Sequence, residues 1–159
     1  MIRRCFSNKS PEIIGPLYTA LIRPIIETNS SIWCPWLEKD IQLLDQVQHR
    51  VQSLCSTNVP FCSLSERRRR TDMRETYKLI HEQYKLHRYD ILTPCNDNNL
   101  RGHSLKLYKE RSRTDIRKHF FANRIVNDWN SLPETTVTAS SVHSFKNRLE
   151  LGANGEIPE

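Results

Sequence analysis

Apolar residues recur at helical spacing through the first part of the chain and predict a long amphipathic helix over residues 11–27. Ser10-Pro11-Glu12 marks its start, with a capping residue, a proline in the first turn and an acid near the positive helix end. Pro24 lies inside this helix and predicts a kink, because proline lacks the backbone donor that a helix interior requires. The spacing predicts a wide buried face, formed by two rows, Ile13, Leu17, Leu21 and Ile25, and Ile14, Tyr18, Ile22 and Ile26.

Two further helices are predicted before residue 90. The first covers residues 38–55 and repeats apolar residues at Ile41, Leu44, Val47 (or Gln48), Val51 and Leu54. The second covers residues 65–89 and has only a thin apolar face, at Met73, Tyr77, Ile80 and Tyr84. Residues 93–100 then read as a turn-rich loop.

The pattern changes after residue 100. Residues 104–109 alternate partly between polar and apolar and predict a short strand, and residues 113–121 are its expected antiparallel partner in a basic β-hairpin. Residues 121–131 predict a helix with Phe121, Ile125 and Trp129 on one face, ended by Pro133. A last helix starts near Ser140-Ser141, and its predicted inner face is Val142, Phe145 and Leu149.

These elements predict a mainly α fold with a short basic β-hairpin and a C-terminal helical pair. The 159 residues suffice for one domain, or for a small domain with an extension. The expected parts are a helical hairpin over 10–56, a basic helix and linker over 57–100, a C-terminal extension over 101–150 and a disordered tail over 151–159.

Positive charge is concentrated in one stretch of the chain. Residues 101–124 carry eight Lys/Arg and two acids, so that 8 − 2 = +6 equals the net charge of the whole chain. Such a local excess indicates a polyanionic partner, whose phosphates lysine and arginine would contact. The candidates for nucleic-acid contact are Arg67, Arg70 and Arg74 in the predicted helix, and Arg101, Lys106, Lys109, Arg111, Arg113, Arg117, Lys118 and Arg124 in the predicted hairpin segment.

Other interpretations stay open for part of this set. The run Arg67–Arg70 with Arg74 is also typical of a solvated helix face, balanced by Glu66, Asp72 and Glu75, or of a nuclear import signal. The aromatic residues Phe120, Phe121 and Trp129 have two interpretations, a base-stacking platform or the core of a small helix.

The motifs of common enzyme classes do not occur in the sequence. Gly is scarce, with four residues, and the chain has no Gly-rich phosphate loop, no Asp-Asp pair, no GxSxG and no HExxH. The set Cys55, Cys62, His81 and His87 has its cysteines too far apart for a zinc finger, and its histidines would diverge on a helix. We therefore predict no catalytic residue, no metal ligand and no cofactor in this chain.

The cysteines and the hydropathy indicate the compartment. The count of five is odd, no CxxC occurs and no signal peptide is evident, which predicts reduced thiols in the nucleus or cytoplasm and no secretion. No apolar run approaches the roughly 20 residues of a membrane span.

A series of motifs resembles a known family. The motifs are LYTALIRPIIE (17–27), WCP (33–35), KDIQLLDQVQHR (39–50), RRRRTDMRETYKLIH (67–81), RGHSLKLYK (101–109), FFANRIVNDWNSLP (120–133) and SFKNRLE (144–150). In this order the series resembles the C-terminal region, the thumb and post-thumb parts, of jockey/LINE-type non-LTR retrotransposon reverse transcriptases.

The resemblance implies a thumb-like helical bundle from the first two helices, gripping primer–template behind the polymerase palm. It places the basic hairpin and the WNSLP helix near template RNA or target DNA. The parent protein would be a nuclear RNA-directed DNA polymerase, usually with an endonuclease domain, that binds Mg²⁺ in its palm. Fingers and palm have no counterpart here, and the connection between Val59 and Arg67 is shorter than the family pattern.

The expected function is thus that of a truncated reverse transcriptase fragment that lacks the catalytic palm and keeps a surface for RNA and DNA. An alternative is a helical protein–protein interaction module without catalytic activity, which would bind a partner through the helix 11–27 and the Trp33–Trp36 turn. A third is enzyme activity through residues that the sequence does not reveal.

Overall fold

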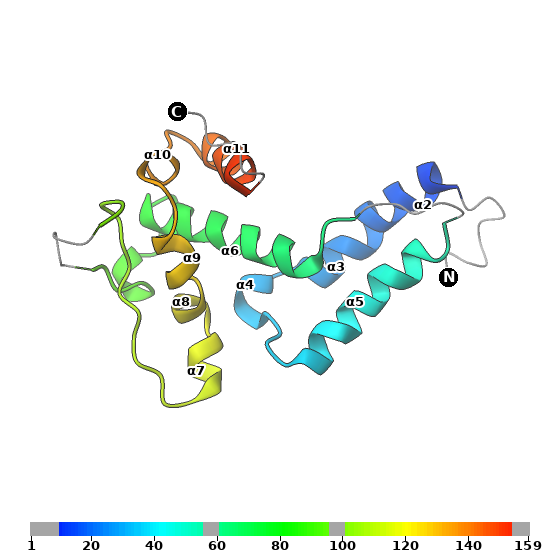
Figure 1. Cartoon of the computed structure of the whole chain (residues 1–159), viewed down its shortest axis with the longest axis horizontal. Coiled ribbons are helices and arrows are strands. Elements are labelled where there is room, and N and C mark those ends of the chain that lie inside the picture. Colours follow the sequence, from blue (N-terminus) through cyan, green and yellow to red (C-terminus); the bar gives the residue numbers. More distant parts are fainter. Residues whose placement is uncertain (1–9, 56–60, 96–100, 154–159) are drawn as a thin grey trace. The chain divides into compact units, whose positions relative to one another are not determined.

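The computed structural model describes residues 10–55, 61–95 and 101–153, and these are mainly helical, which confirms the prediction of a mainly α fold (Figure 1). The chain divides into two compact units, Met1–Arg68 and Arg69–Glu159. The boundary falls inside helix α6 (Leu64–Ile80), so the predicted basic helix and linker over 57–100 is shared between the two units.

The first predicted helix is formed by three consecutive pieces, α2 (Pro11–Leu17), the π-helical turn η1 (Tyr18–Ile22) and α3 (Arg23–Glu27). The backbone N–H of Arg23 donates to the carbonyl of Tyr18, five residues back, which is the π pattern. A regular helix would press the ring of Pro24 against the carbonyl four residues earlier. The disturbance predicted at Pro24 therefore appears as a widened turn directly before it.

The rest of the first unit folds back on this helix. Asn29 adopts a left-handed conformation, with φ of 53°, and is followed by α4 (Ser30–Trp33) and α5 (Glu38–Gln52). Figure 1 shows α5 running back beside α2 and α3. The Tyr18 hydroxyl donates to Oε1 of Gln48 at 3.1 Å, and Ile14, Tyr18 and Val51 form the buried cluster.

The second unit is built around the remainder of α6. The indole of Trp129 and the ring of Phe145 are fully buried, and Phe145 stacks on Tyr77 of α6 with ring centroids 4.5 Å apart. The predicted inner face of the last helix is confirmed, since Phe145 and Leu149 are buried and Val142 packs against the same core. The other elements are the 3-10 turn η2 (Arg88–Asp90), α7 (Asp115–His119), α8 (Phe121–Arg124), α9 (Val126–Asn130), α10 (Glu134–Val137) and α11 (Val142–Ala153).

The predicted β-hairpin is wrong. Its second strand, residues 113–121, is helical instead, as α7 and the start of α8. Thr114 caps α7, because its hydroxyl oxygen accepts a hydrogen bond from the N–H of Arg117 at 3.4 Å. The described residues form one isolated antiparallel bridge, between Pro94 and Leu107, and no strand.

The predicted extent of several helices is also wrong. The helix predicted over 65–89 ends at Ile80, where the chain turns through a left-handed Glu82 with φ of 53°. The helix predicted over 121–131 is interrupted at Ile125. Helix α11 continues to Ala153, so the first part of the predicted tail is helical, while residues 154–159 and the loop residues 96–100 lie outside the described part of the chain.

Candidate nucleic-acid interface

The segment predicted as the first strand, residues 104–109, bends at Ser104 and Leu105 and forms a single bridge residue at Leu107, where a side chain takes the place of a second neighbouring strand. The backbone N–H of Leu107 donates to Oδ1 of Asn130 at 2.9 Å, and Nδ2 of Asn130 donates back to the Leu107 carbonyl at 2.8 Å. On the other side, the N–H of Tyr108 donates to Thr93 and that of Cys95 donates to Lys106, at 2.8 and 2.9 Å. The backbone around Leu107 is thus hydrogen-bonded on both sides.

The neighbouring residues attach the same segment to helices α8, α9 and α10. Nε1 of Trp129 donates to the Leu105 carbonyl at 2.8 Å, and Nδ2 of Asn123 donates to the Ser112 hydroxyl at 2.7 Å. Glu134 accepts from the N–H and the hydroxyl of Ser104, at 2.8 and 3.0 Å. The RGHSLKLYK and WNSLP motifs are therefore joined directly, residue to residue.

His103 is buried in this joint. Its Nε2 lies 3.0 Å from the carbonyl of Trp129, which can only accept, so Nε2 carries the hydrogen. Its Nδ1 is buried and has no hydrogen-bond partner among the described residues. A second proton would place an unsatisfied donor there, and burial accordingly lowers the pKa of His103 below its usual value, outweighing the Trp129 bond and the charge of Glu134.

Glu110 and Arg117 form an ion pair that connects the extended segment to α7. Nη2 of Arg117 donates to Oε2 of Glu110 at 2.6 Å, and the hydrogen bond and charge of Arg117 lower the pKa of the Glu110 carboxyl. The guanidinium of Arg117 also lies over the ring of Phe120, 5.5 Å from its centroid. This arginine holds the segment in place and is already bound to an acid of the protein.

Four other candidate cations are directed to solvent. Lys109, Arg111, Arg113 and Lys118 are exposed, and none forms an ion pair with a carboxylate among the described residues. The remaining acid of the stretch, Asp115, is exposed in the first turn of α7. We call these four residues the basic segment.

The two candidates that precede the basic segment lie at its edge. Arg101 is exposed, and its carbonyl accepts a hydrogen bond from Nζ of Lys106, which is half-buried. The ammonium group of Lys106 is therefore engaged with the backbone of the protein.

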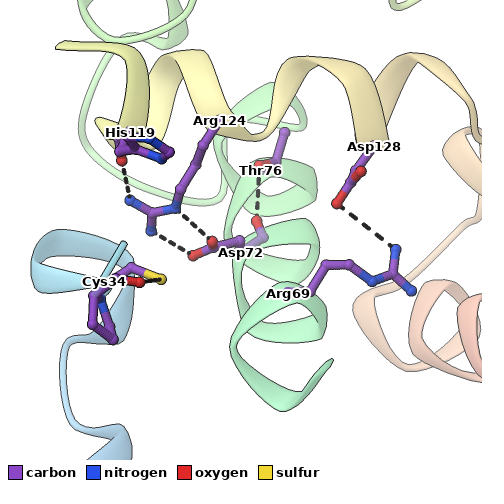
Figure 2. Close-up of polar contacts among 8 residues, drawn as sticks. Cys34, Arg69, Asp72, Thr76, His119, Arg124 and Asp128 are labelled. Atoms are coloured by element: carbon purple, nitrogen blue, oxygen red, sulfur yellow. Dashed lines mark hydrogen bonds and ion pairs between the residues drawn. The ribbon is translucent and has the colours of Figure 1, made fainter. Parts of the chain in front are cut away.

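Arg124 is a cross-link between helices. Its guanidinium donates to both carboxylate oxygens of Asp72, at 2.9 and 3.0 Å, and to the carbonyl of His119 at 3.2 Å, as Figure 2 shows. The side chains of Arg124 and Asp72 are only 15% and 8% exposed. Because its donors are used inside the fold, we leave Arg124 out of the basic segment.

The arginines of α6 do not share one open face. Arg67 forms a two-point ion pair with Glu27 in the first unit, and that hydrogen bond raises the pKa of Arg67. Arg68 is buried, and Nη1 of Arg69 lies 3.9 Å from Asp128 of α9 (Figure 2). Arg70 and Arg74, the other two candidates on this helix, are both partly buried. Arg67, Arg68 and Arg69 are therefore engaged within their own units.

The structure separates the three aromatic candidates. Phe121 and Trp129 belong to the buried core, which confirms the core interpretation for both. Phe120 is 46% exposed. Sequence reasoning missed the bracing role of Asn130, whose one sequence signal is its place in the WNSLP motif.

No metal site or membrane helix emerges from the described part of the chain. Its His, Cys, Asp and Glu side chains nowhere gather in a group of three or more that could hold a metal ion. No disulfide joins Cys34, Cys55, Cys62 and Cys95. None of the helices there combines the length and apolar character that crossing a membrane requires.

Comparison of the chain with protein-family models, with curated proteins and with solved structures gives no match.

Proposed function

We propose that this protein binds nucleic acid through the basic segment, Lys109, Arg111, Arg113 and Lys118. The observation that carries the proposal is that these four exposed cations form no ion pair with a carboxylate among the described residues, whereas Arg67, Arg117 and Arg124 do. Lysine and arginine release counterions when they bind phosphates, so the contact is electrostatic and independent of base sequence.

The bracing of the segment supports this role. Hydrogen bonds from Trp129 and Asn130 to backbone carbonyls, and from Asn123 to the Ser112 hydroxyl, hold the chain on either side of Lys109 and Arg111. A backbone that is already held loses less conformational entropy on binding than a flexible one. The segment therefore acts as a preorganised platform for a phosphate backbone.

The order of the motifs gives the proposal its biological setting. We propose that the first unit corresponds to the thumb of a jockey/LINE-type reverse transcriptase, and the second unit to the region that follows it. In that setting RNA and DNA are the partners and the nucleus is the site of action. The chain positions nucleic acid without catalysing the formation of phosphodiester bonds. A polymerase assay on a homopolymer template with Mg²⁺ then gives no incorporation, and primer extension by the purified chain would refute this assignment.

The direct test is salt-dependent binding of the whole chain to a labelled single-stranded RNA. Four phosphate contacts predict a slope of about −3 in a plot of log K against log salt, or about 50-fold weaker binding between roughly 50 and 200 mM salt. Replacing all four cations by glutamine should abolish most of this slope. A slope near zero for the wild type would refute the proposal.

A matched control separates the basic segment from total charge. Lys39, Arg50, Lys85 and Lys146 are also exposed, and Lys146 alone of these lies near a carboxylate of the described residues, that of Glu150 at 3.9 Å. Replacing these four by glutamine changes the net charge by the same amount. The proposal requires this control to keep nearly all of the binding, and equal loss in both variants would show that only overall charge matters.

A specific observation favours the interaction module as a second candidate. In the first unit Ile25 and Ile32 are 75% and 78% exposed, and Trp33 and Trp36 are each about two-fifths exposed. Binding of a partner protein to these residues should persist after nuclease treatment and should be lost on Ile25→Glu and Ile32→Glu substitution. Binding that nuclease abolishes would exclude it.

A further inference from the structure

Three exposed apolar side chains are close in sequence to the basic segment. Tyr108 is 56% exposed, Ile116 is 75% exposed and Phe120 is 46% exposed. Each is within two residues of at least one of the four cations. Two of the three, Tyr108 and Phe120, carry aromatic rings, and exposed rings near cations in the sequence are the features that single-strand binding combines.

The fold turns these rings outward. Leu107 is buried in the core, and the next residue, Tyr108, is exposed. Phe121 is likewise buried, whereas Phe120 occupies the extended N-cap position between α7 and α8, with φ of −63° and ψ of 148°. At both places one member of a neighbouring pair anchors the chain and the other projects from it.

The two rings belong to one connected part of the second unit. Tyr108 precedes Glu110 by two residues, and Glu110 is bonded to Arg117, whose guanidinium covers Phe120 at 5.5 Å. The other exposed tyrosines of this unit differ, because their hydroxyls are engaged, that of Tyr84 with Glu75 and that of Tyr89 with Arg88. Tyr108 has no such contact among the described residues.

We propose that Tyr108 and Phe120 stack on unpaired bases of a single-stranded nucleic acid whose phosphates contact the basic segment. This rests on the proposed function and specifies its substrate. An exposed ring can stack on any base, and removing such a ring typically weakens binding about 5- to 100-fold. In a duplex the base faces are already stacked on each other, so the rings gain nothing there. The site should therefore prefer single strands.

The experiment compares one RNA of about 12 nucleotides, long enough to cover a site of this kind, with the duplex of the same sequence. Binding of the whole chain to both is followed by fluorescence anisotropy at several salt concentrations. Tyr108→Leu and Phe120→Leu remove the ring and keep an apolar side chain. Tyr89→Leu is the control, because Tyr89 is 54% exposed, close to the 56% of Tyr108, but its hydroxyl is bound by Arg88 and it precedes the basic segment by 20 residues.

We expect the wild type to bind the single strand more tightly than the duplex. Each of the two leucine variants should lose about 5- to 100-fold in single-strand affinity, with an unchanged salt slope and unchanged duplex affinity. Tyr89→Leu should behave as wild type. Melting temperatures verify folding, which these exposed positions should not affect.

Failure of the stacking inference can be distinguished from failure of the proposed function. Equal affinity of the wild type for single strand and duplex, or full affinity in both leucine variants, would overturn the stacking inference and leave the proposed phosphate contact intact. Absence of salt-dependent binding to either probe would overturn both.

Discussion

Replacing Asn130 by alanine removes both hydrogen bonds that take the place of a neighbouring strand beside Leu107. Their lengths are 2.8 and 2.9 Å, and each such bond contributes about 0.5–1.5 kcal/mol net, so we expect a loss of about 1–3 kcal/mol in the stability of the second unit. For a unit of this size that corresponds to a fall in melting temperature of roughly 4–20 °C.

Amide hydrogen exchange gives the local readout. The N–H of Leu107 donates to Asn130, so its protection should fall in Asn130→Ala well before the rest of the core exchanges. Asn127→Ala is the control, since Asn127 is an exposed residue on the same short helix and shares the gain in helix propensity. The free energy of unfolding of Asn127→Ala should stay within about 0.5 kcal/mol of the wild-type value.

A second substitution tests the directions of the two bonds. Asn130→Asp keeps the acceptor for the Leu107 N–H but loses the donor, and at neutral pH it sets a carboxylate against the Leu107 carbonyl. It should be at least as destabilising as alanine at pH 7 and recover relative to alanine below about pH 4, where the acid becomes a donor. An unchanged stability and a protected Leu107 amide in Asn130→Ala would refute the bracing role.

Two further predictions concern buried polar groups of the second unit. Arg124→Ala and Asp72→Ala should each cost about 3 kcal/mol, because each leaves a largely buried charge unpaired, and the double substitution should cost less than the sum in a urea-unfolding cycle. Burial lowers the pKa of His103 from its ordinary value of 6.5, so its contribution to stability is present above about pH 6.5 and is lost as the pH falls further. His103→Gln should reduce the fall in melting temperature between pH 7 and pH 5, and an equal fall in this variant and the wild type would contradict the assignment.

The sequence pattern predicted structure well where neighbouring residues alone determine it. The apolar spacing identified the buried residues Tyr18, Val51 and Phe145, because a helix face is a property of one helix. The face predicted over residues 11–27 was too wide, since Leu21 and Ile25 of its first row are 57% and 75% exposed. Pro24 predicted that the helix is irregular but not how, since whether a helix kinks or forms a π turn depends on the turn as a whole. The end of α6 at Ile80 is not marked by Gly or Pro in the sequence. Glu82, which follows it, has a left-handed backbone conformation that a glutamate does not predict.

The error in the hairpin has a physical cause. The Thr114-Asp115 pair is a helix start, but the alternating residues before it favoured reading the basic stretch as two strands. The partner of the extended backbone is the amide of Asn130, 23 positions away, and the partner of Arg124 is Asp72, 52 positions away. Charge counting cannot tell an arginine bound to a distant acid from one facing solvent, so only the fold separates the basic segment from the rest.

The side-chain amide beside Leu107 also bears on self-association. An extended stretch normally offers its unused N–H and C=O groups to any passing strand, which is a common route to aggregation. Here Thr93 and Cys95 form hydrogen bonds with one edge of the extended backbone, and Asn130 with the other. At Leu107 this backbone therefore has no unpaired edge to which another chain could add a strand. At Leu107 the backbone is thus closed to a strand from another copy of the chain, while the side chains of Tyr108 and Lys109 next to it stay exposed.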